Sequence, residues 1–81
     1  MGKVFVILRI FPEENADLSQ IEEKLKEVPG FKEARREPIG FGIEVIKAGF
    51  VVEDAEGNKV EEMVSQIEGV KEAETIEATL I

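Results

Sequence analysis

The chain has 81 residues, 43% of them apolar, which is enough for one small domain with a packed core and too few for two. It contains no cysteine and no histidine, which excludes disulfide frameworks, thiolate nucleophiles, Cys/His zinc sites and imidazole bases. The formal net charge of −8 argues against a phosphate-rich partner. It is compatible with a basic protein partner or simply with a solvated acidic surface.

The first predicted element is a strand over residues 4–11, a run of β-branched and aromatic residues that ends at Pro12. This run is too short for a membrane span and is not followed by a cleavage pattern, so we expect a cytoplasmic location. Arg9 shares one face of the strand with apolar neighbours, and we expect that face to be partly exposed. These neighbours are Phe5, Ile7 and Phe11.

A helix is predicted after this strand. Asp17 is a candidate N-cap, with Gln20 three residues later as in a capping box. The apolar stripe has helical spacing and consists of Leu18, Ile21, Leu25 and Val28. Pro29 and Gly30 end the helix, and residues 31–37 are predicted to form a short, polar edge strand.

The second half of the chain repeats the first at an offset of 39 residues. Residues 60–73 match residues 21–34 with six identities in fourteen pairs. The two units of this internal repeat are residues 4–37 and 43–76, within a single domain over residues 1–81. Each unit is predicted to form a strand, a helix and a second strand.

In the second unit, the predicted strand from residue 43 precedes a helix capped by Asn58 with Glu61. The stripe of this helix is Val60, Met63, Val64 and Ile67. Gly69 ends the helix, and residues 70–81 supply the last strand.

Two such units in series predict a ferredoxin-like α+β fold of the order βαββαβ. We expect a four-stranded antiparallel sheet in the order 4-1-3-2, with two helices on one face. The facing of the third strand stays open. The repeat places Lys47 on the same face as Leu8, which should be core, and Gly49 is a candidate bulge that would shift the register.

Few side chains are candidates for catalysis. Ser19 and Ser65 lie on predicted helices without a base nearby. Neighbouring glutamates on a helix point about 100° apart and do not converge on a substrate. The acidic residues before Gly57 do not have EF-hand spacing and favour a turn. We therefore expect a protein that is not an enzyme, with no catalytic residue, no metal site and no cofactor.

The segment Pro-Ile-Gly-Phe-Gly-Ile, residues 38–43, lies at the junction of the two units. Proline restricts the start of this segment, and the two glycines free the backbone on both sides of Phe41. This pattern predicts Phe41 at the tip of a short loop, as an interface anchor; the alternative is a phenylalanine folded back into the core. The candidate partner-binding residues are Pro38, Ile39, Gly40, Phe41 and Gly42.

The same segment, followed by a hydrophobic strand and Val-Val-Glu-Asp at 51–54, resembles the catalytic domain of the translation elongation factor 1-beta family. The opening residues 4–12 resemble its short archaeal members. The resemblance implies a ferredoxin-like fold and guanine-nucleotide exchange on the elongation factor 1-alpha GTPase, with the loop of Phe41 in contact with the GTPase. We expect a monomer without a direct nucleic-acid partner or a membrane partner.

The last residues depart from this family, whose members end with a lysine or carry an arginine near the end. Here no basic residue follows Lys71. Either exchange does not use such a side chain here, or the chain is a truncated, redesigned or non-exchanging relative. Two other functions also stay open: a regulatory module that binds a small ligand between paired domains, and an engineered ferredoxin-like domain without activity.

Overall fold

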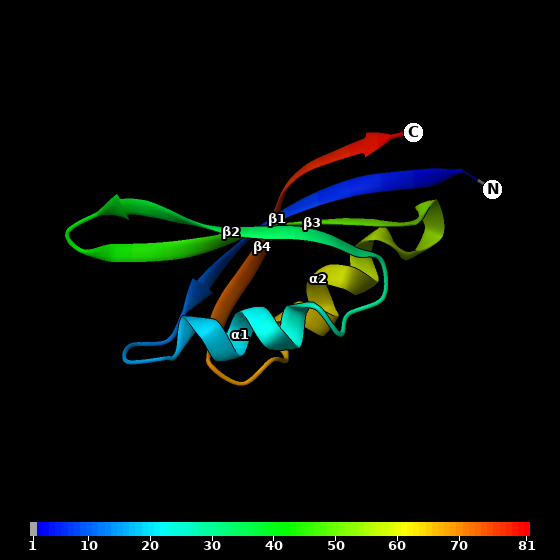
Figure 1. The fold of residues 1–81 in the computed structure, drawn as a ribbon. Helices are drawn as coiled ribbons and strands as arrows, with labels where there is room; N and C mark the ends of the chain where they lie inside the picture. Colours follow the sequence, from blue (N-terminus) through cyan, green and yellow to red (C-terminus); the bar gives the residue numbers. More distant parts are fainter. Residues whose placement is uncertain (1) are drawn as a thin grey trace.

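The computed structural model describes residues 2–81, which form one antiparallel sheet with two α-helices on one of its faces (Figure 1). The elements in chain order are β1 (Lys3–Pro12), α1 (Leu18–Leu25), β2 (Phe31–Gly40), β3 (Ile43–Glu53), the 3-10 helix η1 (Asp54–Glu56), α2 (Gly57–Ser65) and β4 (Val70–Leu80). The sheet order is β2-β3-β1-β4. The predicted ferredoxin-like fold and its strand order are therefore confirmed.

The core lies between the helices and the sheet. Alternate residues of β1 are buried because successive side chains of a strand point to opposite faces. The largest fully buried side chains come from β1, β3 and both helices: Phe50, Leu8, Ile10, Ile21, Leu25, Ile46, Val6, Val45, Val60 and Val64. Among residues 2–81, no helix is long and apolar enough to cross a membrane.

The N-terminus of α1 forms as predicted. The Oδ1 atom of Asp17 accepts a hydrogen bond from the backbone N–H of Ser19 at 2.9 Å, so the cap is confirmed. The helix ends at Leu25, before the predicted stop, and Val28 packs against the core from the following turn. Gly30 closes that turn at φ +88°, where a side chain would collide with the carbonyl oxygen of Val51.

The start of α2 differs from the prediction. Asn58 is not the N-cap, because the helix begins at Gly57 with Glu56 as the capping residue. The reason is η1, which continues from the end of β3 directly into α2. The backbone therefore already turns before Asn58 is reached.

The apolar stripe of α2 is narrower than predicted. Val60 and Val64 are fully buried, and Ile67 packs against the core from beyond the helix. Met63 is 39% exposed, so its placement in the core stripe is wrong. Gly69, at φ +94°, lies in the turn before β4 rather than at the helix end, which is at Ser65.

The facing of β3 is now determined. Lys47 pairs with Arg9, whereas Ala48 pairs with Leu8, so Lys47 lies on the face away from the helices. The placement that the repeat suggested is wrong by one residue. Gly49 is not a bulge in the unbroken β1–β3 register; a Cβ atom there would lie 2.9 Å from the ring of Phe5, which explains the glycine.

The two ends of the described chain lie side by side. The backbone N–H of Ile81 donates to the carbonyl oxygen of Lys3 at 3.0 Å. In Figure 1 both ends lie on the right, at the end of the sheet opposite to the turn between β2 and β3.

Candidate functional site

The β2–β3 hairpin projects beyond the helices as a two-stranded arm, visible in green at the left of Figure 1. All residues from 38 to 44 are exposed, and we call this segment the arm. The sequence predicts a loop for this segment, but β2 continues to Gly40 and pairs there with Ile43. The edge strand is thus longer than predicted, and the turn itself contains two residues. The molecule measures 41 × 22 × 17 Å.

The turn consists of Phe41 at φ 55° and Gly42 at φ 74°. Two-residue hairpin turns with positive φ at both positions match the twist of the strands that they join. The Phe41 side chain is fully exposed, with a relative accessibility of 102%. Its predicted place at the tip is confirmed, and the alternative of a phenylalanine folded into the core is wrong.

Phe41 is flanked by two further exposed apolar side chains. Ile39 is 47% exposed and Ile43 is 51% exposed. We call these three residues the apolar tip. Large apolar groups gathered at one exposed point are typical of interaction sites. Phe41 also adopts a left-handed backbone conformation that disfavours L-residues, and such strain is concentrated at functional sites.

The tip shares its end of the molecule with the loop between β1 and α1. An open groove of about 670 Å³ separates the two. Its lining includes Glu13, Glu14, Leu18, Ile43 and Glu44. The loop contains Asn15, which also has positive φ, a conformation that asparagine tolerates better than most residues. The lining also includes Lys71, so the charged residues of the groove are three glutamates and one lysine.

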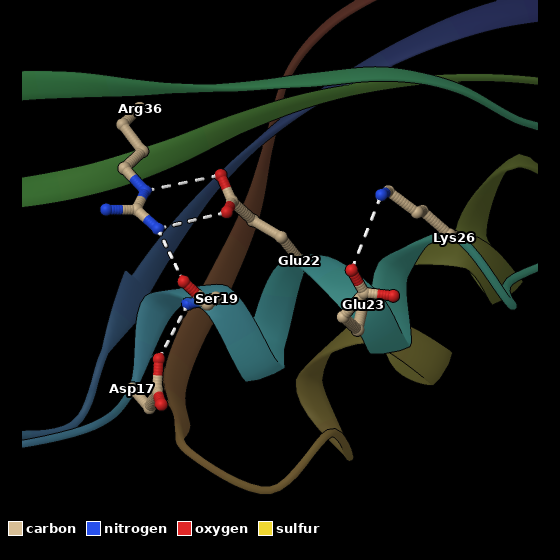
Figure 2. A network of polar contacts seen from close by, with 6 residues as sticks. All are labelled: Asp17, Ser19, Glu22, Glu23, Lys26 and Arg36. Atoms are coloured by element: carbon tan, nitrogen blue, oxygen red, sulfur yellow. Dashed lines mark hydrogen bonds and ion pairs between the residues drawn. The ribbon is translucent and has the colours of Figure 1, made fainter.

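On the helix side, the arm is attached to the fold by Arg36. Its Nε and Nη2 atoms donate to the two carboxylate oxygens of Glu22 at 3.3 and 3.1 Å, and Nη2 also donates to Oγ of Ser19 at 3.0 Å (Figure 2). The hydrogen bonding of Arg36 to Glu22 is the main cause that raises the pKa of Arg36. The negative charge of Glu22 is the second cause. The guanidinium of arginine is charged throughout the physiological pH range, and so is the carboxylate of an ionised glutamate.

On the opposite face, Glu37 lies 4.0 Å from both Arg9 and Lys47. Since β3 lies between β1 and β2, the Arg9–Glu37 contact spans β3, where Val45 pairs with Glu37. Val45 is fully buried although it lies on the face that the helices leave open. Arg9, Glu37 and Lys47 lie on this same open face of the sheet. Arg9 also contacts Glu74 of β4 at 3.8 Å.

The structure places all five predicted site residues on the arm: Pro38, Ile39, Gly40, Phe41 and Gly42. Pro38 is tolerated because β2 is an edge strand. Sequence reasoning missed Arg36 and Glu37, which lie next to the arm. The alternation of side chains along a strand predicts that Arg36 and Glu37 point to opposite faces of the sheet. It cannot predict their partners, because these lie on other elements.

The remaining polar candidates have structural contacts. Glu22 binds Arg36, whereas Glu23 binds Lys26 at 3.5 Å, so these neighbouring glutamates do not act together (Figure 2). Thr75 donates to Glu61 at 2.7 Å. Within residues 2–81, no group of three or more acidic side chains has a metal-binding arrangement.

Comparison with known proteins identifies the family. The model of the EF-1 guanine nucleotide exchange domain matches residues 5–81. Elongation factor 1-beta of Methanoregula boonei is 43% identical over 54 residues, and that of Methanocorpusculum labreanum is 41% identical over 55 residues. These matches cover 64% and 65% of the chain, and the chain spans 64% of the length of each relative. The chain belongs to the EF-1 guanine nucleotide exchange domain family.

Proposed function

We propose that this chain promotes release of GDP from elongation factor 1-alpha, with the arm as the element that contacts the GTPase. The observation that carries the proposal is the fully exposed Phe41 at the tip of the arm, in a member of an exchange-domain family. The chain acts in the cytoplasm, as a monomer, without direct contact to nucleic acid or membrane. It performs no covalent chemistry.

Exchange by binding alone requires a difference in affinity. The chain accelerates release only if it binds the nucleotide-free GTPase more tightly than the nucleotide-bound form. By linkage, the factor by which the chain weakens GDP binding equals the factor by which GDP weakens binding of the chain.

The apolar tip supplies binding free energy in this scheme. Phe41 exposes its whole ring in the free protein, so an apolar pocket on the partner would remove a large apolar surface from water. If this pocket is open only in the nucleotide-free GTPase, burial of Phe41 makes the chain bind that form more tightly, which accelerates release of GDP. The acidic residues beside the tip favour a partner whose pocket has a basic rim.

Release of a fluorescent GDP analogue from an archaeal elongation factor 1-alpha tests the proposal. We expect the release rate to rise with the concentration of the chain and then to saturate. The dissociation constant of the chain should also increase when GDP is added, by the factor that linkage requires. An unchanged release rate at saturating chain concentration would contradict the proposed function.

A further inference from the structure

We propose that Arg36, with Glu22 as its partner, is a positioning residue that sets the direction of the arm and thereby the place where the apolar tip meets the GTPase. The proposal rests on the proposed exchange function and deepens it. It assigns a role in exchange to two residues that lie outside the arm. Arg36 acts through the arm and does not itself need to touch the partner.

The first argument is the position of Arg36 along the hairpin. Arg36 pairs with Ile46, which is fully buried, and lies two residues before the first residue of the arm. Beyond this point, residues 38–44 are all exposed. A two-stranded ribbon without a covering layer is weakly held and twists readily. The direction of the arm is therefore decided where the ribbon leaves the covered part of the sheet.

The second argument is the geometry of the contact. Two nitrogens of one planar guanidinium bind the two oxygens of one carboxylate, as Figure 2 shows. Such a forked contact restricts angle as well as distance, which a single hydrogen bond does not. A displacement of the arm toward or away from α1 breaks both bonds together.

The third argument is the rigidity of the anchor. Glu22 and Ser19 lie on α1, next to the fully buried Ile21. Ser19 is held in turn by Asp17 at the N-cap. The guanidinium is thus hydrogen-bonded to a helix that packs into the core. These bonds fix the position of β2 relative to α1.

The contact on the opposite face is looser. Glu37 lies 4.0 Å from Arg9 and from Lys47, and its contacts have no forked geometry. Contacts of this kind restrict the angle between the groups less than a forked contact does. The helix-side contact is therefore the one whose loss should redirect the tip.

The chain offers a matched control for Glu22. Glu23 is the next residue of α1 and pairs with Lys26 in a more exposed contact, where the Glu23 side chain is 72% exposed against 25% for Glu22. Glu22→Gln and Glu23→Gln remove the same charge from the same helix. Only the change at Glu22 removes a carboxylate that binds Arg36 of β2.

The direction of the arm can be measured with two spin labels, because the chain has no cysteine of its own. We place single cysteines at the exposed Lys24 on α1 and at Ile43 on the arm. We expect Glu22→Gln to broaden or shift the distance distribution, and Glu23→Gln to leave it unchanged. Identical distributions in the two variants would overturn the proposal.

The exchange assay provides the functional readout. A misdirected arm reduces the fraction of molecules ready to bind, which raises the half-saturating concentration and leaves the maximal release rate unchanged. We expect about a fivefold rise in that concentration for Glu22→Gln, the size expected for loss of one partly exposed ion pair, and less than about twofold for Glu23→Gln. Arg36→Lys should behave like Glu22→Gln, since lysine keeps the charge and loses the fork.

Two failures are distinguishable. If the unmodified chain does not accelerate release, the proposed function fails and the role of Arg36 in exchange fails with it. If the unmodified chain is active and Glu22→Gln matches Glu23→Gln in half-saturating concentration, only the positioning role is overturned. A lower maximal rate at an unchanged half-saturating concentration would likewise overturn it, because that result describes a defect after binding.

Discussion

Strands β2 and β3 pass through two different environments, and the comparison separates stability from function. In the covered half, Phe50 is fully buried, and its ring meets that of Phe31 edge-on with centroids 5.8 Å apart. In the arm, the same two strands carry only exposed residues, 38–44. One hairpin therefore provides core packing along one part of its length and an unpartnered apolar tip along the other. Substitutions in the covered part should lower the free energy of unfolding. Substitutions at the tip should weaken exchange and leave that free energy nearly unchanged.

The largest effect is expected in the covered half. Phe50 is fully buried in the covered half of β3, so Phe50→Ala should lower the free energy of unfolding by about 3–5 kcal/mol. Urea denaturation measures the loss. Ile43→Ala on the arm is the control and should change this free energy by less than about 0.5 kcal/mol. Similar losses in both variants would mean that the arm is part of the core.

The next effect belongs to the tip. Phe41→Ala should raise the half-saturating concentration in the exchange assay about 30-fold. Truncation of an aromatic anchor that is buried in a complex costs about 2 kcal/mol of binding free energy. The free energy of unfolding should stay within about 0.5 kcal/mol. Met63→Ala, at an exposed apolar residue of α2, is the control and should leave exchange unchanged. Full activity of Phe41→Ala would remove the tip from the binding surface.

A smaller effect tests the backbone strain at Phe41. Glycine tolerates the left-handed conformation, so Phe41→Gly should be more stable than Phe41→Ala by about 1 kcal/mol in urea denaturation. Both variants should lose exchange equally. At Ile43, which lies in a strand, the order should reverse and alanine should be the more stable substitution. Equal stability of the two Phe41 variants would show that the turn is not strained in solution.

Much of the fold could be predicted because its signals are local. The stripe of α1, the Asp17 cap and the glycines around Phe41 each lie within a few neighbouring residues. The facing of β3 could not be predicted in this way. Val45 and Ile46 are neighbours and are both fully buried, so the strand lacks the alternation that reveals which side faces the core.

The misses at the site have a different cause. Glu22 and Arg36 are fourteen residues apart, and their contact depends on how α1 lies against β2. No spacing rule within one element can reveal such a pair. The N-terminus of α2 differs from the prediction because η1 already turns the backbone before Asn58. In both cases the outcome depends on how two elements are joined or packed, which the pattern within one element does not show.

The closeness of the two chain ends has a practical consequence. Ile81 is hydrogen-bonded to Lys3, and Figure 1 shows both chain ends at the end of the sheet opposite to the turn between β2 and β3. A protein, a label or a solid support joined at either end would extend away from the arm. The arm can therefore be presented outward from a larger assembly or an immobilised surface with its approach path open.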